Sequence, residues 1–479
     1  MYTLASSSLD IPNTQRNNYA FSQIRKESLD LYNRLHSIEK DIHFVNQVHD
    51  AYPQFPLIPN LRCGAWYTDP AIVQDQPGAY FKSTDGHTSN WTFNLRRPNL
   101  HLLPLIVTHD GIVLVDSTRS GKRIPDALSK TVPIWCAVVN RAIRLRYPNK
   151  VDNWDIALYT PPTVVSKNEH NEIENLLDNW AKDLQESSYS LPELQRPLRP
   201  IWLTPASSGF PHFSNNSQPF IPVVCVSASE CIEEGTDRRS GGYVYIQGSG
   251  DDHELWGMGL TPNIFWRDRD AILSADRSEI VTIVTTRVVD AKNKEGVARK
   301  PTGIRKVGQR LLVCSISDLA DKGGPSHICS EADMAFLIIA TRREEGTIVE
   351  DPRVLSLVTP EGKKGHVHFL QHIVPQALAF IGRQLTQGAR VCVACDDGKD
   401  LSVGITVIAL QRFFDDEGNF IGSSTRNLGA CIRPFRKTIR KLLEWIIADR
   451  PEANPSRSTL KRVNEFLMSP AFVPPILDY

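Results

Sequence analysis

The segment from residue 390 to 410 places the tightest constraint on the fold. Arg390–Cys395 has the length and apolar character of a buried strand, Asp396–Asp400 is a polar turn containing a glycine, and Leu401–Leu410 is an apolar helix. An amphipathic helix over His366–Leu385, ended by Gly388, comes before the strand. Helix, strand, loop and helix in succession indicate a parallel α/β sheet. The N–H groups of the loop would meet at a helix N-terminus, which favours an anion such as phosphate.

This segment resembles the phosphate loop of the dual-specificity phosphatases, in which a nucleophilic Cys is followed by five residues and then Arg. Cys395 and Ser402 match the nucleophile and the Ser that follows, but Leu401 stands where the Arg is needed. Without the guanidinium group, a phosphoryl transition state loses its bidentate partner, so we predict no cysteine-phosphatase chemistry.

Two interpretations of the loop remain. Cys395 is either a buried strand-end residue of an inactive domain, or the loop has been converted to bind a phosphate. We favour the second, in which Lys399 supplies charge and Asp396, Asp397 or Asp400 holds a metal or a ribose hydroxyl. The predicted phosphate loop consists of Cys395, Asp396, Asp397, Gly398, Lys399, Asp400 and Ser402.

The rest of the chain also has an α/β pattern. Residues 21–49 are amphipathic with helical spacing, and residues 167–193 form an acidic helical stretch. Strands are predicted at Leu102–Val107, Gly111–Val115, Ile221–Val226, Tyr243–Gln247 and Glu279–Thr285. At 479 residues the chain exceeds one core, and Ala320–Ser330 has the composition of a linker. We predict a flexible N-terminus (1–20), an N-terminal α/β domain (21–330) and a C-terminal phosphatase-like α/β domain (331–479).

A polar loop with Gly-Lys follows the strand that ends at Asp116. It is not a nucleoside-triphosphate loop, because Asp116 replaces the first glycine and Arg123 replaces the final Ser or Thr. A strand-ending acid before Ser, Thr, Gly and Lys suits a ribose phosphate, although such an Asp often only caps a turn.

Two further loops combine glycine with titratable side chains. Gly248-Ser-Gly250 leads into Asp251, Asp252, His253 and Glu254, which predicts a metal or general-base site or, alternatively, an acidic helix start. Phe81–His87 holds Lys82, Asp85 and His87, and Asn90, Trp91, Arg96 and Arg97 follow it. Lys, Arg and an aromatic residue together would suit a nucleic-acid backbone and a base, and a plain β-turn at Asp85-Gly86 is the alternative.

Seven motifs follow one order along residues 20–470: Leu61–Tyr67, Ala79–His87, Val113–Arg123, Pro133–Val138, Tyr245–Trp256, Gly259–Pro262 and Cys395–Asp400. Together they resemble the initiator-tRNA phosphoribosyltransferase family, also called the tRNA 2′-O-ribosylphosphate transferases. The resemblance implies a unique N-terminal domain and a C-terminal domain similar to dual-specificity phosphatases. It implies transfer of ribosyl phosphate from 5-phosphoribosyl-1-diphosphate to the 2′-hydroxyl of adenosine 64 in initiator methionine tRNA, which would distinguish initiator from elongator tRNA.

That chemistry requires diphosphate to be held and a poorly acidic hydroxyl to lose its proton, with Mg²⁺ as the expected cofactor. The expected catalytic residues are Asp116, Asp251, Asp252 and His253. The expected substrate-binding residues are Lys82, Asp85, His87, Ser117, Thr118, Gly121, Lys122, Arg123, Gly248 and Gly250. The alternative function is a catalytically inactive phosphatase-like protein that binds phosphate or RNA.

The overall charge is zero, with 54 basic and 54 acidic residues, but this sum conceals a basic region. Residues 421–465 hold ten Lys or Arg against four acids, a local net charge of +6. We predict tRNA phosphate contacts there, from Arg433, Arg436, Lys437, Arg440 and Lys441. The chain has no apolar run near the roughly 20 residues of a membrane span and no secretory signal, and its cysteines are scattered, so we expect a reduced, cytoplasmic protein without a membrane partner.

Overall fold

The computed structural model describes residues 26–468 except 61–62, 74–77, 120, 149–152, 214–217, 233–238, 241, 295–300, 321–332, 342–350, 361–364, 366 and 423–435. The predicted flexible N-terminus (1–20), the linker residues 321–330 and Arg433 lie outside the described residues. The chain divides into two compact units. The first consists of residues 1–93, 102–182 and 192–294, and the second of residues 94–101, 183–191 and 295–479.

A four-stranded parallel sheet lies at the centre of the first unit. Its strands are β1 (Leu57–Pro59), β2 (Ile112–Asp116), β3 (Leu198–Leu203) and β4 (Ile221–Ser227), in the order β1-β2-β4-β3. Every residue of β1, β2 and β4 is buried, as expected of a parallel sheet covered on both faces. The predicted strands at 111–115 and 221–226 are therefore confirmed.

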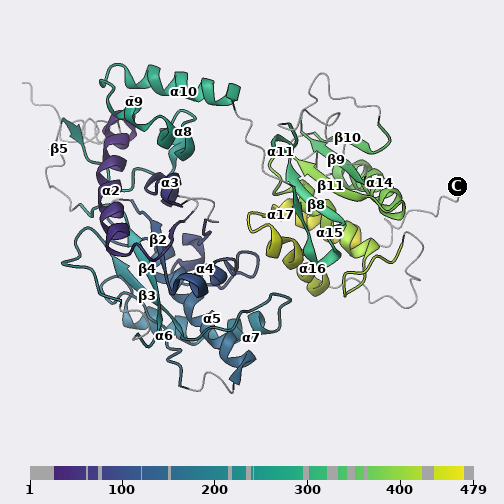
Figure 1. The fold of residues 1–479 in the computed structure, drawn as a ribbon, viewed down its shortest axis with the longest axis horizontal. Helices are drawn as coiled ribbons and strands as arrows, with labels where there is room; N and C mark the ends of the chain where they lie inside the picture. The colour runs from purple at the N-terminus through teal and green to yellow at the C-terminus, as the bar shows by residue number, and fades with distance from the viewer. Residues whose placement is uncertain are drawn as a thin grey trace, which may run out of the picture. The chain divides into compact units, whose positions relative to one another are not determined.

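Helices cover both faces of this sheet. Val113, Val115, Val224 and Val226 share one apolar core with α2 (Leu31–Ala51), the short helix η1 (Gly64–Trp66) and the α8–α10 helices, and Figure 1 shows α2 running beside the strands. The α8–α10 helices span Pro262–Arg267, Arg269–Leu273 and Ile280–Lys294. On the other face, Asn140 of α5 (Val132–Arg146) accepts from and donates to the backbone of Leu198 in β3. The remaining elements of this unit are α3 (Pro70–Val73), η2 (Ser83–Gly86), α4 (Leu102–His109), η3 (Ala127–Thr131), α6 (Lys167–Glu174), α7 (Leu177–Gln185), β5 (Arg239–Ser240), β6 (Tyr243–Val244) and η5 (His253–Leu255).

Two predicted strands are wrong, because both segments are helices. Residues 102–107 lie in α4, where Leu102, Leu103 and Ile106 are buried while Val107 is exposed, a helical spacing of the apolar face. Periodicity alone cannot separate a short buried strand from a buried helix in so short an apolar run.

The predicted strand at 279–285 is the start of α10. Its β-branched residues have modest helix propensity, but burial of Ile280, Val284 and Val288 on one face outweighs that preference. The hydroxyl of Thr285 donates to the carbonyl of Val281 one turn earlier, so this polar group has a hydrogen-bond partner within the helix. The predicted strand at 243–247 is shorter than expected, since only Tyr243–Val244 pair, in antiparallel fashion with β5.

The second unit is built on a five-stranded sheet of order β10-β9-β11-β8-β7. Its strands are β7 (Thr302–Gly303), β8 (Leu311–Ser315), β9 (Met334–Ala340), β10 (Val354–Val358) and β11 (Arg390–Cys395), all parallel except the β7–β8 pair. Its helices are η6 (Arg305–Val307), α11 (Ser317–Ala320), η7 (Phe369–Ile373), α14 (Val374–Thr386), α15 (Leu401–Phe413), α16 (Arg436–Asp449) and α17 (Arg457–Met468). The apolar α15 packs on β11 and β8 and is itself covered by α16 and α17 (Figure 1).

The predicted domain boundary at residue 330 lies too late in the chain. Strand β8 pairs along its whole length with β11, so residues 311–315 belong to the second sheet. The last segment of the first unit ends at residue 294, and the second unit continues from residue 295. The sequence argument overlooked this because the composition of residues 320–330 is more loop-like than that of the true junction.

Two short segments of the N-terminal half belong to the second unit. The phenol of Tyr189 donates to the carbonyl of Leu95 at 2.7 Å, and the hydroxyl of Ser188 donates to Glu444 of α16 at 2.8 Å. Residues 94–101 and 183–191 are thus structural parts of the C-terminal unit.

Candidate active site in the first unit

Asp116 and Asn60 form a buried pair where β2 and β1 end. The Asn60 amide nitrogen donates to Asp116 Oδ2 at 2.8 Å, and the Ser117 N–H donates to Asp116 Oδ1 at 2.9 Å. Asn60 also exchanges two hydrogen bonds with the backbone of Phe81, which fixes the 81–87 loop to the same edge of the sheet. The carboxyl edge of a parallel sheet is the usual ligand position in such folds.

Acid–base pairs join the 81–87 loop to the loop after β2. Asp126 lies 2.6 Å from the Lys122 ammonium, 3.3 Å from that of Lys130 and 3.8 Å from the His87 ring. The hydroxyl of Thr131 donates to the Lys82 carbonyl at 3.0 Å. The predicted residues Lys82, His87 and Lys122 are therefore brought into one neighbourhood.

Arg119 bridges the loop after β2 to the acidic loop at 251–252. Its guanidinium lies 3.0 Å from Asp251 Oδ2 and 2.8 Å from Asp252 Oδ2, and its side chain is largely exposed. Asp252 has a left-handed backbone with φ of 47°, which aims its carboxylate at the arginine. This ion pair makes the two acids weaker candidates for a metal or a general base than isolated carboxylates would be.

Gly248 is a position where only glycine fits. It has φ of 68°, and a Cβ there would stand 2.5 Å from the carbonyl oxygen of Thr118. The loops at 117–119 and 248–250 therefore pack backbone against backbone. The N–H of Gly250 in turn donates to the Tyr67 phenol oxygen, at 2.9 Å.

A buried polar network lies beneath these loops. Asp41, in the middle of α2, accepts from Ser229 at 2.6 Å and from the Tyr245 phenol at 2.7 Å. Ser229 lies 2.6 Å from the Ser117 hydroxyl, so the network reaches the residue next to Asp116. Burial raises the pKa of Asp41 to about 8, although the bonds from Ser229 and Tyr245 oppose that shift.

We expect Asp41→Asn to flatten the pH dependence of stability. A carboxyl group whose pKa rises on folding stabilises the fold below its ordinary pKa near 4, and that contribution is lost as pH rises toward 8. The free energy of unfolding of the natural chain should thus fall relative to that of the variant between pH 5.5 and 7.5, by up to about 1.4 kcal/mol per pH unit. Urea unfolding at both pH values measures this. Asp50→Asn, an exposed change on the same helix, is the control, and equal slopes in all three proteins would contradict the assignment.

The structure thus assembles the predicted residues of the three N-terminal loops at one sheet edge, with differing accessibility. Asp116, Ser117 and Thr118 are buried, His87 and Arg123 are exposed, and Lys82, Asp85, Asp251, Asp252 and His253 are partly buried. Sequence reasoning missed the residues that join them: Asp41, Asn60, Arg119, Asp126, Ser229 and Tyr245. The only signal for Asn60 was a polar residue directly after the apolar run of β1.

The loop after β11 in the second unit is filled by its own side chains. Asp397 Oδ1 accepts the N–H groups of Lys399 at 2.8 Å and Asp400 at 3.1 Å, and lies 3.2 Å from Cys395 Sγ. Asp396 accepts from the backbone of Thr341 and Asp400 from that of Ser456. The amides of Lys399 and Asp400 are therefore taken by Asp397, and each of the three acids already accepts hydrogen bonds within the fold.

We expect Cys395 to be unreactive. Burial raises the pKa of its thiol, and the neighbouring Asp397 carboxylate opposes formation of a thiolate. Iodoacetamide at pH 7 should leave Cys395 unmodified while it alkylates the partly exposed Cys231, as read by peptide mass spectrometry. Hydrolysis of p-nitrophenyl phosphate should be undetectable, and rapid labelling of Cys395 would contradict this assignment.

Comparison with known families decides the relationship. The family model described as the Rit1 N-terminal domain matches residues 24–289, more than half of the chain, and the one described as the Rit1 DUSP-like domain matches residues 353–467. The chain belongs to the Rit1 family. The predicted resemblance and the predicted α/β class are therefore confirmed, and the second description assigns a phosphatase-like character to the C-terminal unit.

Rit1-family relatives extend over nearly the whole chain. A Saccharomyces cerevisiae protein named tRNA A64-2′-O-ribosylphosphate transferase is 33% identical over 93% of this chain and 93% of its own. An uncharacterized protein of Schizosaccharomyces pombe is 32% identical over 94% of this chain and 97% of its own. Among solved structures, human DUSP28 is 13% identical with a TM-score of 0.24, covering 36% of this chain and 94% of its own.

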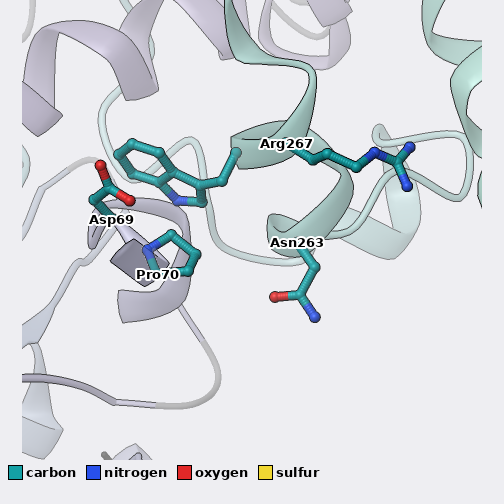
Figure 2. Close-up of a pocket in the computed structure, with 5 residues that line it drawn as sticks. Asp69, Pro70, Asn263 and Arg267 are labelled. Carbon is teal, nitrogen blue, oxygen red and sulfur yellow. The ribbon is translucent and has the colours of Figure 1, made fainter. Parts of the chain in front are cut away.

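The described part of this Rit1-family chain shows no group of three or more His, Cys, Asp or Glu side chains placed to hold a metal ion. It also shows no helix both long and apolar enough to cross a bilayer. A hollow of about 310 Å³ lies between the start of α3 and α8, lined by Asp69, Pro70, Asn263, Trp266 and Arg267 (Figure 2). Arg267 is paired with Asp268, and none of the predicted site residues lines this hollow.

The basic face predicted to contact tRNA is described only in part. Arg440 lies 3.5 Å from Glu444 on α16, and Lys441 lies 3.9 Å from Asp416 and against Trp445. Arg436 and Lys437 are on the same helix. Arg450, counted in the basic surplus of 421–465, is buried, so that surplus overstates the charge available to a ligand.

Proposed function

We propose that this protein transfers ribosyl phosphate from 5-phosphoribosyl-1-diphosphate to the 2′-hydroxyl of adenosine 64 in initiator methionine tRNA. The observation that carries the proposal is the 33% identity, over 93% of both chains, to a yeast protein named tRNA A64-2′-O-ribosylphosphate transferase. The protein is accordingly a pentosyl transferase of tRNA modification. We also propose that it acts in the cytoplasm.

The first-unit site offers the groups that such a transfer needs. In the reaction the bond from C1′ to the diphosphate oxygen breaks, a bond from C1′ to the acceptor O2′ forms, and the O2′ proton leaves. Lys122, Arg119 and Arg123, from one loop, are our candidates for neutralising a departing diphosphate. In the protein alone, Lys122 pairs with Asp126 and Arg119 with Asp251. Asp116, beneath that loop, is our candidate for orienting the ribose hydroxyls or taking the O2′ proton.

We propose Mg²⁺ as a companion of the donor. Mg²⁺ keeps several waters and is commonly held by one or two carboxylates together with substrate phosphates. Asp116, with Asp252 as the second candidate, would provide the protein ligand, and the ion would supply charge neutralisation of the leaving diphosphate.

A diphosphate-release assay tests this function. It combines the full-length protein with 5-phosphoribosyl-1-diphosphate, Mg²⁺ and purified tRNA. We expect diphosphate release only with initiator methionine tRNA whose position 64 is unmodified, and none with elongator methionine tRNA. Mapping of the product should place the added mass at nucleotide 64. Binding of initiator tRNA without any diphosphate release would overturn the transferase and favour the inactive phosphatase-like binding protein.

A further inference from the structure

Arg96 lies beside the loop that lacks its phosphatase arginine. It belongs to the segment 94–101, which is part of the second unit. Its guanidinium donates to the carbonyl of Pro455 at 2.6 Å and to the Asn454 side chain at 3.3 Å. The same 454–456 turn is fixed to the loop, because the N–H of Asn454 donates to Lys399 O at 3.1 Å and that of Ser456 to Asp400 Oδ1 at 2.8 Å.

Three guanidinium groups gather at this rim. Burial lowers the pKa of Arg96, and the positive charges of Arg97 and Arg457 lower it further, while Asp400 is the opposing charge. The Nε atom of Arg96 is buried without a hydrogen-bond partner, and Arg457, at the start of α17, is exposed. Like charges held together at an energetic cost are characteristic of a site that binds an anion.

The interior of the loop cannot accept that anion as it stands. Asp397 takes the amides of Lys399 and Asp400, and Cys395 fills the base. An anion must therefore bind on the rim, where Arg96, Arg97 and Arg457 lie. An open rim with several guanidinium groups suits a polyanion more than a small enclosed phosphate, because phosphates repeated along a strand can contact separate arginines.

We propose that Arg96, Arg97 and Arg457 form a binding site for the sugar–phosphate backbone of RNA. The proposal rests on the proposed function for the identity of the RNA, a tRNA. It joins Arg457, which belongs to the 421–465 region, with Arg96 and Arg97 from the N-terminal half of the chain.

The test measures tRNA binding by full-length protein without donor, by fluorescence polarisation between 50 and 200 mM salt. Arg457→Gln should lower the slope of log affinity against log salt by about one, and the pair Arg96→Gln with Arg457→Gln by about two. At 100 mM salt the double variant should bind tRNA at least about tenfold more weakly. Arg412→Gln, an exposed arginine on α15, is the matched control and should behave like the natural protein.

An unchanged salt slope in Arg457→Gln would overturn the proposal, since the exposed Arg457 side chain can be replaced without disturbing the core. So would a raised KM for 5-phosphoribosyl-1-diphosphate with tRNA binding intact, since the arginines would then serve the donor. Arginine-dependent tRNA binding without diphosphate release overturns the transferase function alone. Normal transfer with normal tRNA affinity in the double variant overturns the arginine site alone.

Discussion

Asp116→Asn should slow ribosyl phosphate transfer by about 10²- to 10⁴-fold, the usual range for loss of a positioned acid–base or charge-stabilising group. Asp116 is buried at the end of β2, and its two oxygens are held by Asn60 and the backbone of Ser117. The amide that replaces it carries no charge and cannot accept a proton. Single-turnover diphosphate release with saturating initiator tRNA and donor measures the effect.

The substitution also has a structural cost that must be separated from the chemical one. The new amide would bring an N–H group toward the Asn60 amide, so about 1–3 kcal/mol of stability should be lost. Rates should be compared at a temperature where urea unfolding shows both proteins folded. Asp110→Asn is the control, because Asp110 precedes the same strand at its opposite end and pairs with Arg196. A rate for Asp116→Asn within threefold of the natural enzyme would remove Asp116 from the mechanism.

Arg450→Met should destabilise the C-terminal unit by about 3–5 kcal/mol, the cost of removing one partner from a buried ion pair. The Arg450 side chain is 5% exposed and lies 3.9 Å from the carboxylate of Asp318 and 3.6 Å from that of Glu452. It also donates to Gly398 O at 3.0 Å and to Thr302 Oγ1 at 3.0 Å. One side chain therefore joins β7, the strand–loop segment at 398 and the end of α16.

Hydrogen exchange of the β8 and β11 amides gives a local readout of that loss. Protection should fall in both strands, while the amides of β2 and β4 in the first unit keep their exchange rates. Lys441→Met is the control, since its contact with Asp416 is exposed and such pairs contribute about 1 kcal/mol or less. Equal protection in Arg450→Met and the control would show that the buried contacts of Arg450 contribute little.

The sequence correctly predicted the strands that lead into the candidate site loops, but it assigned two of the surrounding helices as strands. The runs at 112–116, 221–227 and 390–395 are β-branched, bounded by polar turns and buried on both faces, so length and composition sufficed. Residues 102–107 and 280–285 have similar composition, and tertiary burial of one face made them helical. No local pattern contains that information.

The candidate site shows the same division. Asp116 and the glycine loops could be found because each is a local motif, and the structure brings their loops together. Asn60 is 56 residues from Asp116, and Asp41 is 188 residues from Ser229. Such partners are determined by how strands order in the sheet, which a single sequence does not specify. The predicted phosphate loop lies between β11 and α15 as expected, but the Asp397 carboxylate accepts the N–H groups of Lys399 and Asp400.

The chain passes between its two units at residues 93/94, 101/102, 182/183, 191/192 and 294/295. A polypeptide begun at residue 295 would lack Leu95 and Tyr189, which bond to each other, and would leave Glu444 without Ser188. The phosphatase-like unit is therefore not encoded by one continuous segment of the chain. Exchange of either unit between family members would need more than one crossover point. Because Arg96 bonds to residues 454 and 455 and Ser188 bonds to Glu444, we expect substitutions at 94–101 or 183–191 to be accompanied by substitutions near residues 444 and 455.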